Sequence, residues 1–355
     1  MYYFTGTETP DVSKFRILES EAEWKEAIAK FNDLDIFYSP KYAQAFAKIE
    51  KGKAKAAFYE SHHTKMLYPF ILRDIPFLDN QYKDIVTPYG YGGPIMEGDI
   101  QEIDDFYSLF SQYCNKYHIV TETIRLHPLN DNQEYVKNVA NIRFLMNTAA
   151  VDLQKPYWDI WKAYSTNNQR NIKRAQKMGM SANSVPKTPD NMAIFHQLYE
   201  QTMKRNNANA NYYFSRDFFS ELLAEDPLYK SYLLFVHYQE RVIAAVVLLI
   251  GKEFAHYQFG ASDSDYLHLR PNNYLFDFMI KFSQERGAKL LHLGGGYGGD
   301  DGLFRFKSSF SNIPYYSYYL GTKIYNENIF QQLNELAKKQ DSYNPNYFPP
   351  YRSVI

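Results

Sequence analysis

Three apolar segments separated by very short connections constrain the fold of this chain most strongly. They cover Tyr232–Tyr238, Val242–Ile250 and Phe254–Ala261, and only the tripeptides QER and GKE lie between them. A parallel crossover needs a dozen or more residues, whereas connections of this length join antiparallel hairpin strands. The sequence therefore predicts a three-stranded antiparallel meander whose middle strand is buried.

Helical patterns flank this meander on both sides. A strand near Arg143–Leu153 and helical stretches at Tyr157–Gly179 and Pro189–Met203 precede it. A loop, a helix near Tyr274–Arg286 and a strand near Ala288–Leu293 follow it. Helices before and after an antiparallel set of strands predict an α/β protein of the α+β type, with a mixed sheet covered by helices.

The first part of the chain repeats this order less clearly. A predicted hairpin at Lys55–Ser61 and Lys65–Arg73 is followed by the loop Val86–Met96, a helix within Gln101–Tyr117 and a strand at Val120–Leu126. The 355 residues are also enough for two cores of ordinary size. We therefore predict two similar domains, residues 1–145 and residues 146–355.

The composition limits the classes of partner and compartment. The formal charge is −1, from 39 Lys+Arg against 40 Asp+Glu, so any anion site must be local. Cys114 is the only cysteine, which excludes intramolecular disulfides and fits a reducing compartment. The first residues lack the pattern of a secretory signal, and the longest apolar run, Val242–Gly251, is about half of a membrane span. We expect a cytoplasmic protein without a transmembrane segment.

The stretch HLGGGYGGDDGLFRFKSSF, residues 292–310, is rich in glycine and carries adjacent acids and cations. Its Gly294-x-Gly296-x-x-Gly299 pattern lacks the downstream acid and the chain length of a dinucleotide-binding domain. Consecutive glycines after a buried strand let the backbone approach a ligand or adopt positive φ. Lys307 and Arg305 lie among apolar residues, and a cation held in such a frame suits a charged ligand group.

Two further segments are candidate anion sites. Between Ile160 and Pro189 there are six basic residues and no acid, with Arg170 to Lys177 grouped on one helix side. This pattern fits a solvated helix face or a surface that contacts RNA or phosphate. Arg270, Asn272 and Asn273 stand at a predicted helix start, where they cap the helix or bind an anion. The nine histidines show no metal-ligand spacing, so no metal is expected.

Several segments of the sequence together resemble the Fem-type (FemABX-like) peptidyltransferases, which belong to the GNAT-fold acyltransferases. In the second half these are YSTNNQRNIKRAQKMGM, YEQTMKRNNANANYYFS, the segment from His256 to Gly296, and LFRFKSSF. SPKYAQAF and VTPYGYGGPI resemble first-domain stretches of the same group. The resemblance spans roughly residues 36 to 320 and implies two tandem GNAT-like domains.

The resemblance also implies acyl transfer, in which an amine attacks an activated acyl group. By motif position, Lys307 matches the family's basic residue near the reacting centre, where it would stabilise an oxyanion or fix a substrate phosphate. Asp300, Asp301 and His256 are candidates for accepting the proton of the amine. The residues expected to bind substrate, many of them in a cleft between the domains, are Tyr91, Arg205, Tyr213, Arg270, Asn272, Asn273, Gly294, Gly295, Gly296 and Arg305.

Two departures leave the acyl donor undecided. The GNAT pyrophosphate pattern Arg/Gln-x-x-Gly-x-Gly/Ala is absent from Ser262–Asn273, and no heptad run corresponds to the coiled-coil arm of some Fem proteins. We expect no tightly bound cofactor and a donor that is either aminoacyl-tRNA or acyl-coenzyme A.

The sequence therefore predicts an acyl- or aminoacyltransferase acting on an amino group of a cell-envelope precursor or amino sugar, with tRNA as a candidate partner. One alternative is an acetyl-coenzyme-A-dependent N-acetyltransferase of a nucleotide-linked sugar in surface-polysaccharide synthesis. The other is a non-enzymatic RNA-binding protein that uses the Arg170–Lys177 face. The oligomeric state stays open.

Overall fold

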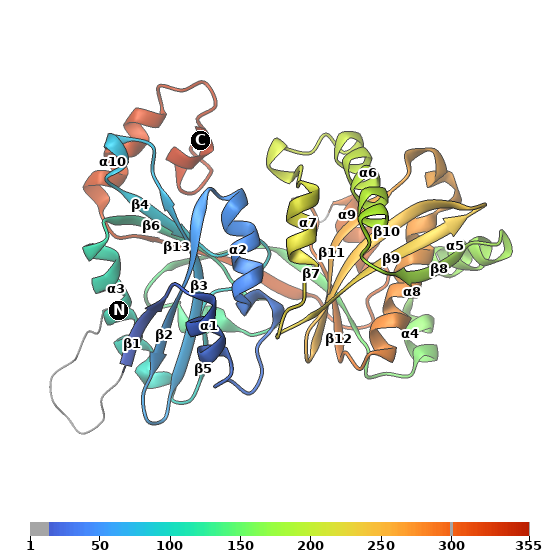
Figure 1. Cartoon of the computed structure of the whole chain (residues 1–355), viewed down its shortest axis with the longest axis horizontal. Helices are drawn as coiled ribbons and strands as arrows, with labels where there is room; N and C mark the ends of the chain where they lie inside the picture. The colour runs from blue at the N-terminus through green and yellow to red at the C-terminus, as the bar shows by residue number, and fades with distance from the viewer. Residues whose placement is uncertain (1–13, 299–300, 355) are drawn as a thin grey trace. The chain divides into compact units, whose positions relative to one another are not determined.

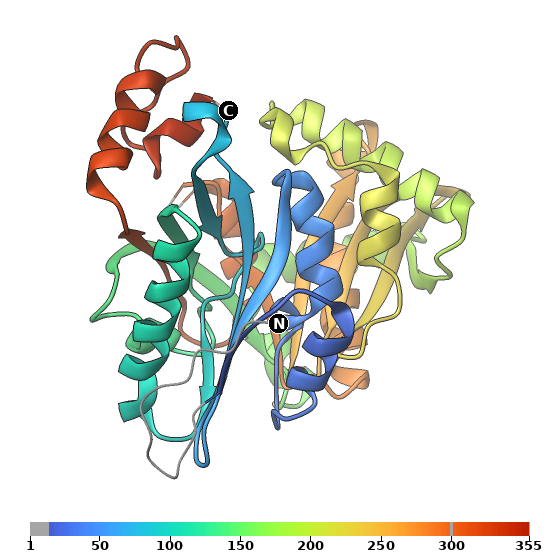
Figure 2. The same ribbon diagram turned by 60° about the vertical axis from the view of Figure 1, so that its left-hand side comes forward.

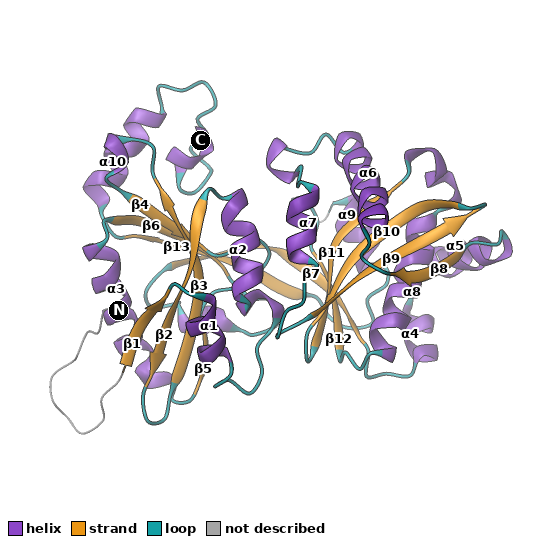
Figure 3. Cartoon of the chain, viewed as in Figure 1, coloured by secondary structure: helices purple, strands orange, loops and turns teal. Residues whose placement is uncertain are grey.

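The computed structural model describes residues 14–298 and 301–354 and divides the chain into two compact units (Figure 1). The first unit comprises the described parts of Met1–Asn32, Phe37–Leu145 and Tyr318–Ile355. The second comprises Asp33–Ile36 and Met146–Ser317. Each unit holds a mixed, mainly antiparallel sheet with helices packed on it, as expected for the predicted fold class (Figure 3).

The sheet of the first unit has the strand order β1-β2-β3-β4-β6-β13, with the short β5 paired to β3. All its pairs are antiparallel except β4 with β6. The main elements are β1 (Lys14–Leu18), α1 (Glu21–Ile28), α2 (Pro40–Ile49), β2 (Gly52–Glu60), β3 (Lys65–Asp74), β4 (Lys83–Val86), β5 (Ile95–Glu97), α3 (Ile103–Lys116), β6 (Ile119–Arg125), β13 (Tyr316–Ile324) and α10 (Glu327–Ala337).

The sheet of the second unit has the order β7-β12-β11-β10-β9-β8, and only β11 with β12 is parallel. Helices α5 and α8 pack on one face of this sheet, and α6 and α7 on the other (Figures 1 and 3). The main elements are β7 (Asn141–Asp152), α4 (Tyr157–Ala163), α5 (Thr166–Lys177), β8 (Ser181–Val185), α6 (Pro189–Arg205), α7 (Arg216–Leu222), β9 (Lys230–Tyr238), β10 (Arg241–Ile250), β11 (Phe254–Ser262), α8 (Pro271–Glu285), β12 (Leu290–Gly294) and α9 (Gly302–Ser308).

The predicted meander is confirmed as strands β9, β10 and β11. Its middle strand β10 is buried from Ile243 to Ile250, because both of its faces are covered. The first hairpin turns at Gln239 and Glu240, which both have positive φ. The helical stretch predicted at Tyr157–Gly179 divides into α4 and α5, since Ser165 accepts a hydrogen bond from the Asn168 amide and starts a new helix.

The C-terminal segment is divided differently from the predicted domain bounds. Residues from Tyr318 onward belong to the first unit, because β13 pairs antiparallel with β6. Helix α10 and the turn Pro350–Val354 then pack together (Figure 2). Tyr351 is buried there with Leu333 and Ala337. The predicted second domain therefore ends too late in the sequence.

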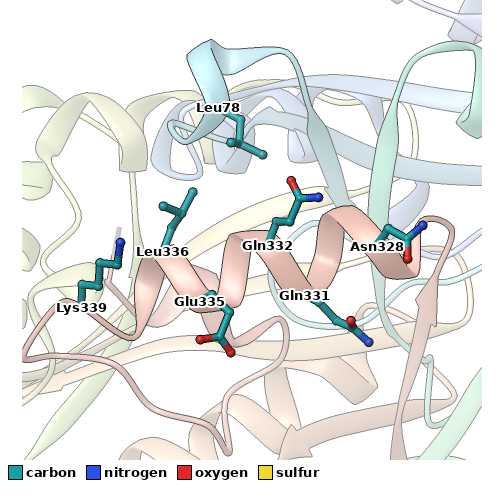
Figure 4. A pocket seen from close by; sticks show the side chains of 7 residues that line it. All are labelled: Leu78, Asn328, Gln331, Gln332, Glu335, Leu336 and Lys339. Carbon is teal, nitrogen blue, oxygen red and sulfur yellow. The ribbon is translucent and has the colours of Figure 1, made fainter.

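A shallow cavity of about 550 Å³ lies beside α10 in the first unit (Figure 4). Leu78, Gln332 and Leu336 face one another in it, while Gln331 and Glu335 point away from Leu78. Its lining contains no histidine, cysteine or aspartate, and none of the predicted site residues is part of it. This cavity is therefore separate from the candidate site.

Candidate functional site at the end of β12

The candidate site lies where two parallel strands of the second unit stop pairing. Within the described chain, the register of β11 and β12 runs from Phe254 with Leu290 to His256 with His292. Strand β11 continues to Ser262, and β12 ends at Gly294, where φ is +77°. Ligands of open α/β sheets commonly bind at the carboxyl ends of strands whose connections diverge.

The glycines after β12 are required by close contacts. A Cβ atom on Gly295 would lie 2.6 Å from the sulfur of Met146, and one on Gly296 would overlap the carboxylate of Asp301. Gly294 needs the left-handed conformation that glycine adopts without strain. The three glycines thus let the backbone pass between β7 and Asp301 and leave its carbonyl groups accessible to neighbouring donors.

Asp301 anchors this loop and starts helix α9. Its carboxylate accepts hydrogen bonds from the amides of Leu303 and Phe304, both at 2.9 Å, and from those of Tyr297 and Gly298. Burial opposes its charge, but these four donors together hold the pKa of Asp301 below its ordinary value. A carboxylate engaged in this way is a poor proton acceptor, so the geometry favours a positioning role over the predicted catalytic one.

Lys307 is the buried cation of the site. Helix α9 places Phe304 and Lys307 on its inner side and turns Arg305 outward to solvent. Lys307 is only 7% exposed, donates a hydrogen bond of 2.8 Å to the Gly295 carbonyl, and lies 5.2 Å from the centre of the Tyr257 ring. Burial lowers the pKa of Lys307 to about 8, and the charge of Asp301 partly opposes this shift.

His256 points away from this cation. Successive side chains of a strand face opposite sides of the sheet, so His256 and its neighbour Tyr257 lie on different faces. His256 Nε2 is 2.8 Å from the carboxylate of Asp35, and the His292 ring lies 5.7 Å away. His292 Nε2 is in turn 2.9 Å from Thr148 Oγ1. The structure therefore does not bring His256 and Lys307 together.

Two of the predicted binding residues converge on Ser262 at the end of β11. Arg205 donates to the Ser262 carbonyl and to Ser264 Oγ, both at 2.9 Å, and to Ser262 Oγ at 3.1 Å. Asn272 Nδ2 reaches the same Ser262 Oγ at 3.5 Å. Burial lowers the pKa of Arg205, against the opposing charges of Tyr297 and Asp263. These contacts fix the loop that leads into α8.

The other predicted residues are distributed more widely. Asn273 is buried and donates to Asn168 Oδ1 at 2.9 Å, so its amide ties α8 to α5. Arg270 is exposed at the start of α8, and Tyr213 is 40% exposed. Tyr91 belongs to the first unit, where it packs on Tyr318. Asp300 lies outside the described residues.

Sequence reasoning missed Asp35, Thr148 and His292 as partners. Asp35 stands 221 positions before His256 and lies in no recognisable motif. Among the described residues, no group of three or more His, Cys, Asp or Glu side chains is arranged to hold a metal ion. In the same part of the chain, no helix is long and apolar enough to cross a membrane.

Comparisons with known proteins agree with this architecture. Residues 163–308 match the family model of the acetyltransferase (GNAT) domain. The crystal structure of FemX is similar over 89% of this chain and 99% of its own, with a TM-score of 0.66 and 13% identity. No curated protein sequence matches the chain.

Two other solved structures share the fold at low identity. The C-terminal domain of a putative lysylphosphatidylglycerol synthetase from Agrobacterium fabrum covers 87% of this chain and 94% of its own, with a TM-score of 0.56 and 14% identity. A tandem GNAT protein from the clavulanic acid biosynthesis pathway covers 88% and 99%, with a TM-score of 0.51 and 7% identity. The chain therefore has the tandem GNAT fold of the Fem type, and its second unit carries the segment that matches the GNAT acetyltransferase domain.

Proposed function

We propose that this protein is an acyl- or aminoacyltransferase that moves an activated acyl group to an amino group of a cell-envelope precursor or amino sugar. The observation that carries this proposal is the buried ammonium of Lys307, held on the Gly295 carbonyl where β11 and β12 stop pairing. The GNAT acyltransferase fold and the structural similarity to FemX support it.

The chemistry follows from the charge that develops during acyl transfer. A neutral amine attacks the carbonyl carbon of an ester or thioester, and the resulting tetrahedral oxyanion collapses as the C–O or C–S bond breaks. Fixed donors aimed at such an oxyanion stabilise it by about 3 kcal/mol each. The Lys307 ammonium has three N–H donors, and its contact with Gly295 uses one of them.

The substrate ammonium must first lose a proton. Asp300, which follows the glycine loop in the sequence, remains the proposed acceptor. His256 contacts Asp35 on the other face of the sheet, away from Lys307, and is not proposed for this step. We assign Asp301 to positioning, because four backbone amides already engage its carboxylate.

The acyl donor is proposed as either aminoacyl-tRNA or acyl-coenzyme A, bound reversibly. The structural similarity to FemX and to a putative lysylphosphatidylglycerol synthetase favours an aminoacyl donor. The match to the acetyltransferase domain favours a thioester, as in the alternative N-acetyltransferase function. Thermal unfolding with each ligand separates the two, because a donor at about 100 times its Kd adds about 2.7 kcal/mol of stability.

The test of the proposed function is the variant Lys307→Ala. Once the donor is identified, turnover should fall at least about tenfold, since a stabilising charge of the transition state is lost. Lys187→Ala is the control, because Lys187 is an exposed lysine that also donates to a backbone carbonyl, that of Leu223 at 2.8 Å. Wild-type turnover in a folded Lys307→Ala protein would contradict the proposal.

A further inference from the structure

Helices α4 and α5 carry an exposed surface that the proposed chemistry does not use. We call it the α4–α5 surface and define it by an exposed indole and exposed cations on two consecutive helices. Its members are Trp158, Lys162, Arg170, Lys173, Arg174 and Lys177. Trp158 is 60% exposed, which is unusual for the largest apolar side chain.

Contacts between the helices make this surface continuous. The Lys162 ammonium lies 5.4 Å above the ring of Trp158, and that of Lys173 lies 5.9 Å from the ring of Trp161. Gln169 Nε2 donates to the Trp161 carbonyl at 3.0 Å and joins α5 to α4. The aromatic and basic side chains therefore belong to one patch.

The core fixes the direction in which the cations point. Ile172 and Ala175 of α5 are buried in the hydrophobic core of the second unit. The cations at 170, 173, 174 and 177 stand at helical spacing on the opposite, solvent-facing side.

The positive charge of the surface is poorly neutralised by the protein itself. Among the described residues, no ion pair involves the four α5 cations, and Arg170 donates only to the amide oxygen of Asn167. On α4, Lys162 forms an ion pair of 3.7 Å with Asp159. Because the whole chain has a net charge of −1, this surface is a local positive field suited to an anionic partner.

We propose that the α4–α5 surface docks the protein on an anionic membrane, with the indole of Trp158 at the level of the lipid headgroups. Tryptophan prefers the membrane interface because its ring is apolar and its N–H is polar. Lys162 covers a face of that ring, which hinders base stacking but leaves the ring edge available for insertion. The four α5 cations attract acidic headgroups. Stable docking needs two contributions, which here are the inserted indole and the basic side chains.

Binding of the 355-residue chain to lipid vesicles tests this surface directly. We expect co-sedimentation with vesicles of phosphatidylcholine mixed with phosphatidylglycerol, weakening with added salt, and little binding to phosphatidylcholine alone. Trp158 emission should shift to the blue on binding, while Trp24, which is 1% exposed, should contribute no change. No salt-sensitive binding to the acidic vesicles would overturn the proposal.

Matched variants separate the contribution of the α5 cations to vesicle binding from that of Trp158. Lys173→Gln with Arg174→Gln should lower the vesicle partition coefficient about fivefold for each cation removed. Trp158→Ala should lower it about tenfold and reduce the blue shift, leaving only the contribution of the partly buried Trp161. Lys338→Gln with Lys339→Gln removes two exposed charges that directly follow α10 in the first unit, and it should leave vesicle binding unchanged. Equal loss in this control would contradict docking through the α4–α5 surface.

A parallel binding experiment with RNA tests whether the anionic partner of this surface is a nucleic acid rather than a membrane. Fluorescence anisotropy with transfer RNA, at the same ionic strength, measures whether these residues bind RNA instead. RNA binding that is lost in the α5 double variant, without vesicle binding, would overturn the membrane proposal. Neither measurement requires turnover, so the outcome is independent of the proposed transferase activity.

Discussion

At the scale of single residues, Lys307 combines burial, a backbone acceptor and an aromatic neighbour. Its segment indicated a held cation, because Phe304, Phe306 and Phe310 surround it in the sequence. The acceptor on Gly295 and the contact with Tyr257 could not be inferred, since they depend on how the loop folds back. The depressed pKa follows from that packing.

The pH dependence of turnover tests whether Lys307 acts as a cation. Because its pKa is lowered to about 8, the ammonium persists below pH 8 and is lost as the pH rises through it. Turnover should therefore decrease as the pH rises through about 8, which gives the pH profile an alkaline limb. Lys307→Arg, whose guanidinium stays charged, should remove that limb in a profile of kcat against pH. Turnover that instead rises through pH 8 would show that neutral Lys307 is the active form.

Burying this charge should also cost stability. The pKa of Lys307 is about 8 in the folded protein and about 10.4 in the unfolded chain, so between these pH values the unfolded chain binds more protons. The free-energy cost of burying the ammonium is therefore full below pH 8 and decreases as the pH rises through this range. Lys307→Met should raise the free energy of unfolding by about 2 kcal/mol at pH 7. Urea unfolding at pH 7 and pH 10 measures the gain, which should be clearly smaller at the higher pH, where most of the penalty has faded.

At the scale of elements, the glycine loop and α9 form one anchored unit. The sequence indicated the conformational freedom of the glycines, but it assigned Asp301 to catalysis and predicted no helix at Gly302–Ser308. An aspartate placed before an apolar, periodic segment is a capping signal that could have indicated α9. The strand β8 was also missed, because its short polar sequence lacks a strand pattern.

Two neighbouring glycines give a matched test of this anchoring. Gly296→Ala should place a methyl group against the Asp301 carboxylate, displace the loop and lower turnover at least about tenfold. Gly298→Ala should be nearly neutral, because nothing lies within 4 Å of the added Cβ atom. Turnover and thermal unfolding of both variants check the contrast, and equal effects would contradict the anchoring role.

At the scale of the whole molecule, segments distant in sequence complete each unit. Asp33–Ile36 belongs to the second unit, and the C-terminal segment belongs to the first. Arg352 donates to the buried carboxylate of Asp84 at 2.6 Å and 3.0 Å, and Tyr351 donates to it at 3.1 Å. The C-terminal turn is therefore part of the first core.

Removing this ionic contact should destabilise the first unit strongly. Arg352→Ala leaves Asp84 with Arg73 as its remaining guanidinium partner, and breaking a buried pair costs about 3 kcal/mol. Lys338→Ala, which breaks an exposed pair with Glu335, should cost less than about 1 kcal/mol. Chemical denaturation of both variants measures the difference. A similar small loss in both would show that the C-terminal turn contributes little.

The sequence by itself determined the meander, most helices and the importance of residues 292–310 with their glycines and Lys307. Hydrophobic periodicity and short connections indicate these features because they depend only on residues close together along the chain. Only the tertiary structure decided that Asp35 meets His256, that Asp301 binds backbone amides, and that Tyr318 onward completes the first unit. These contacts join buried polar groups across long separations. A buried polar group must find a partner, but its own sequence neighbours do not specify which one.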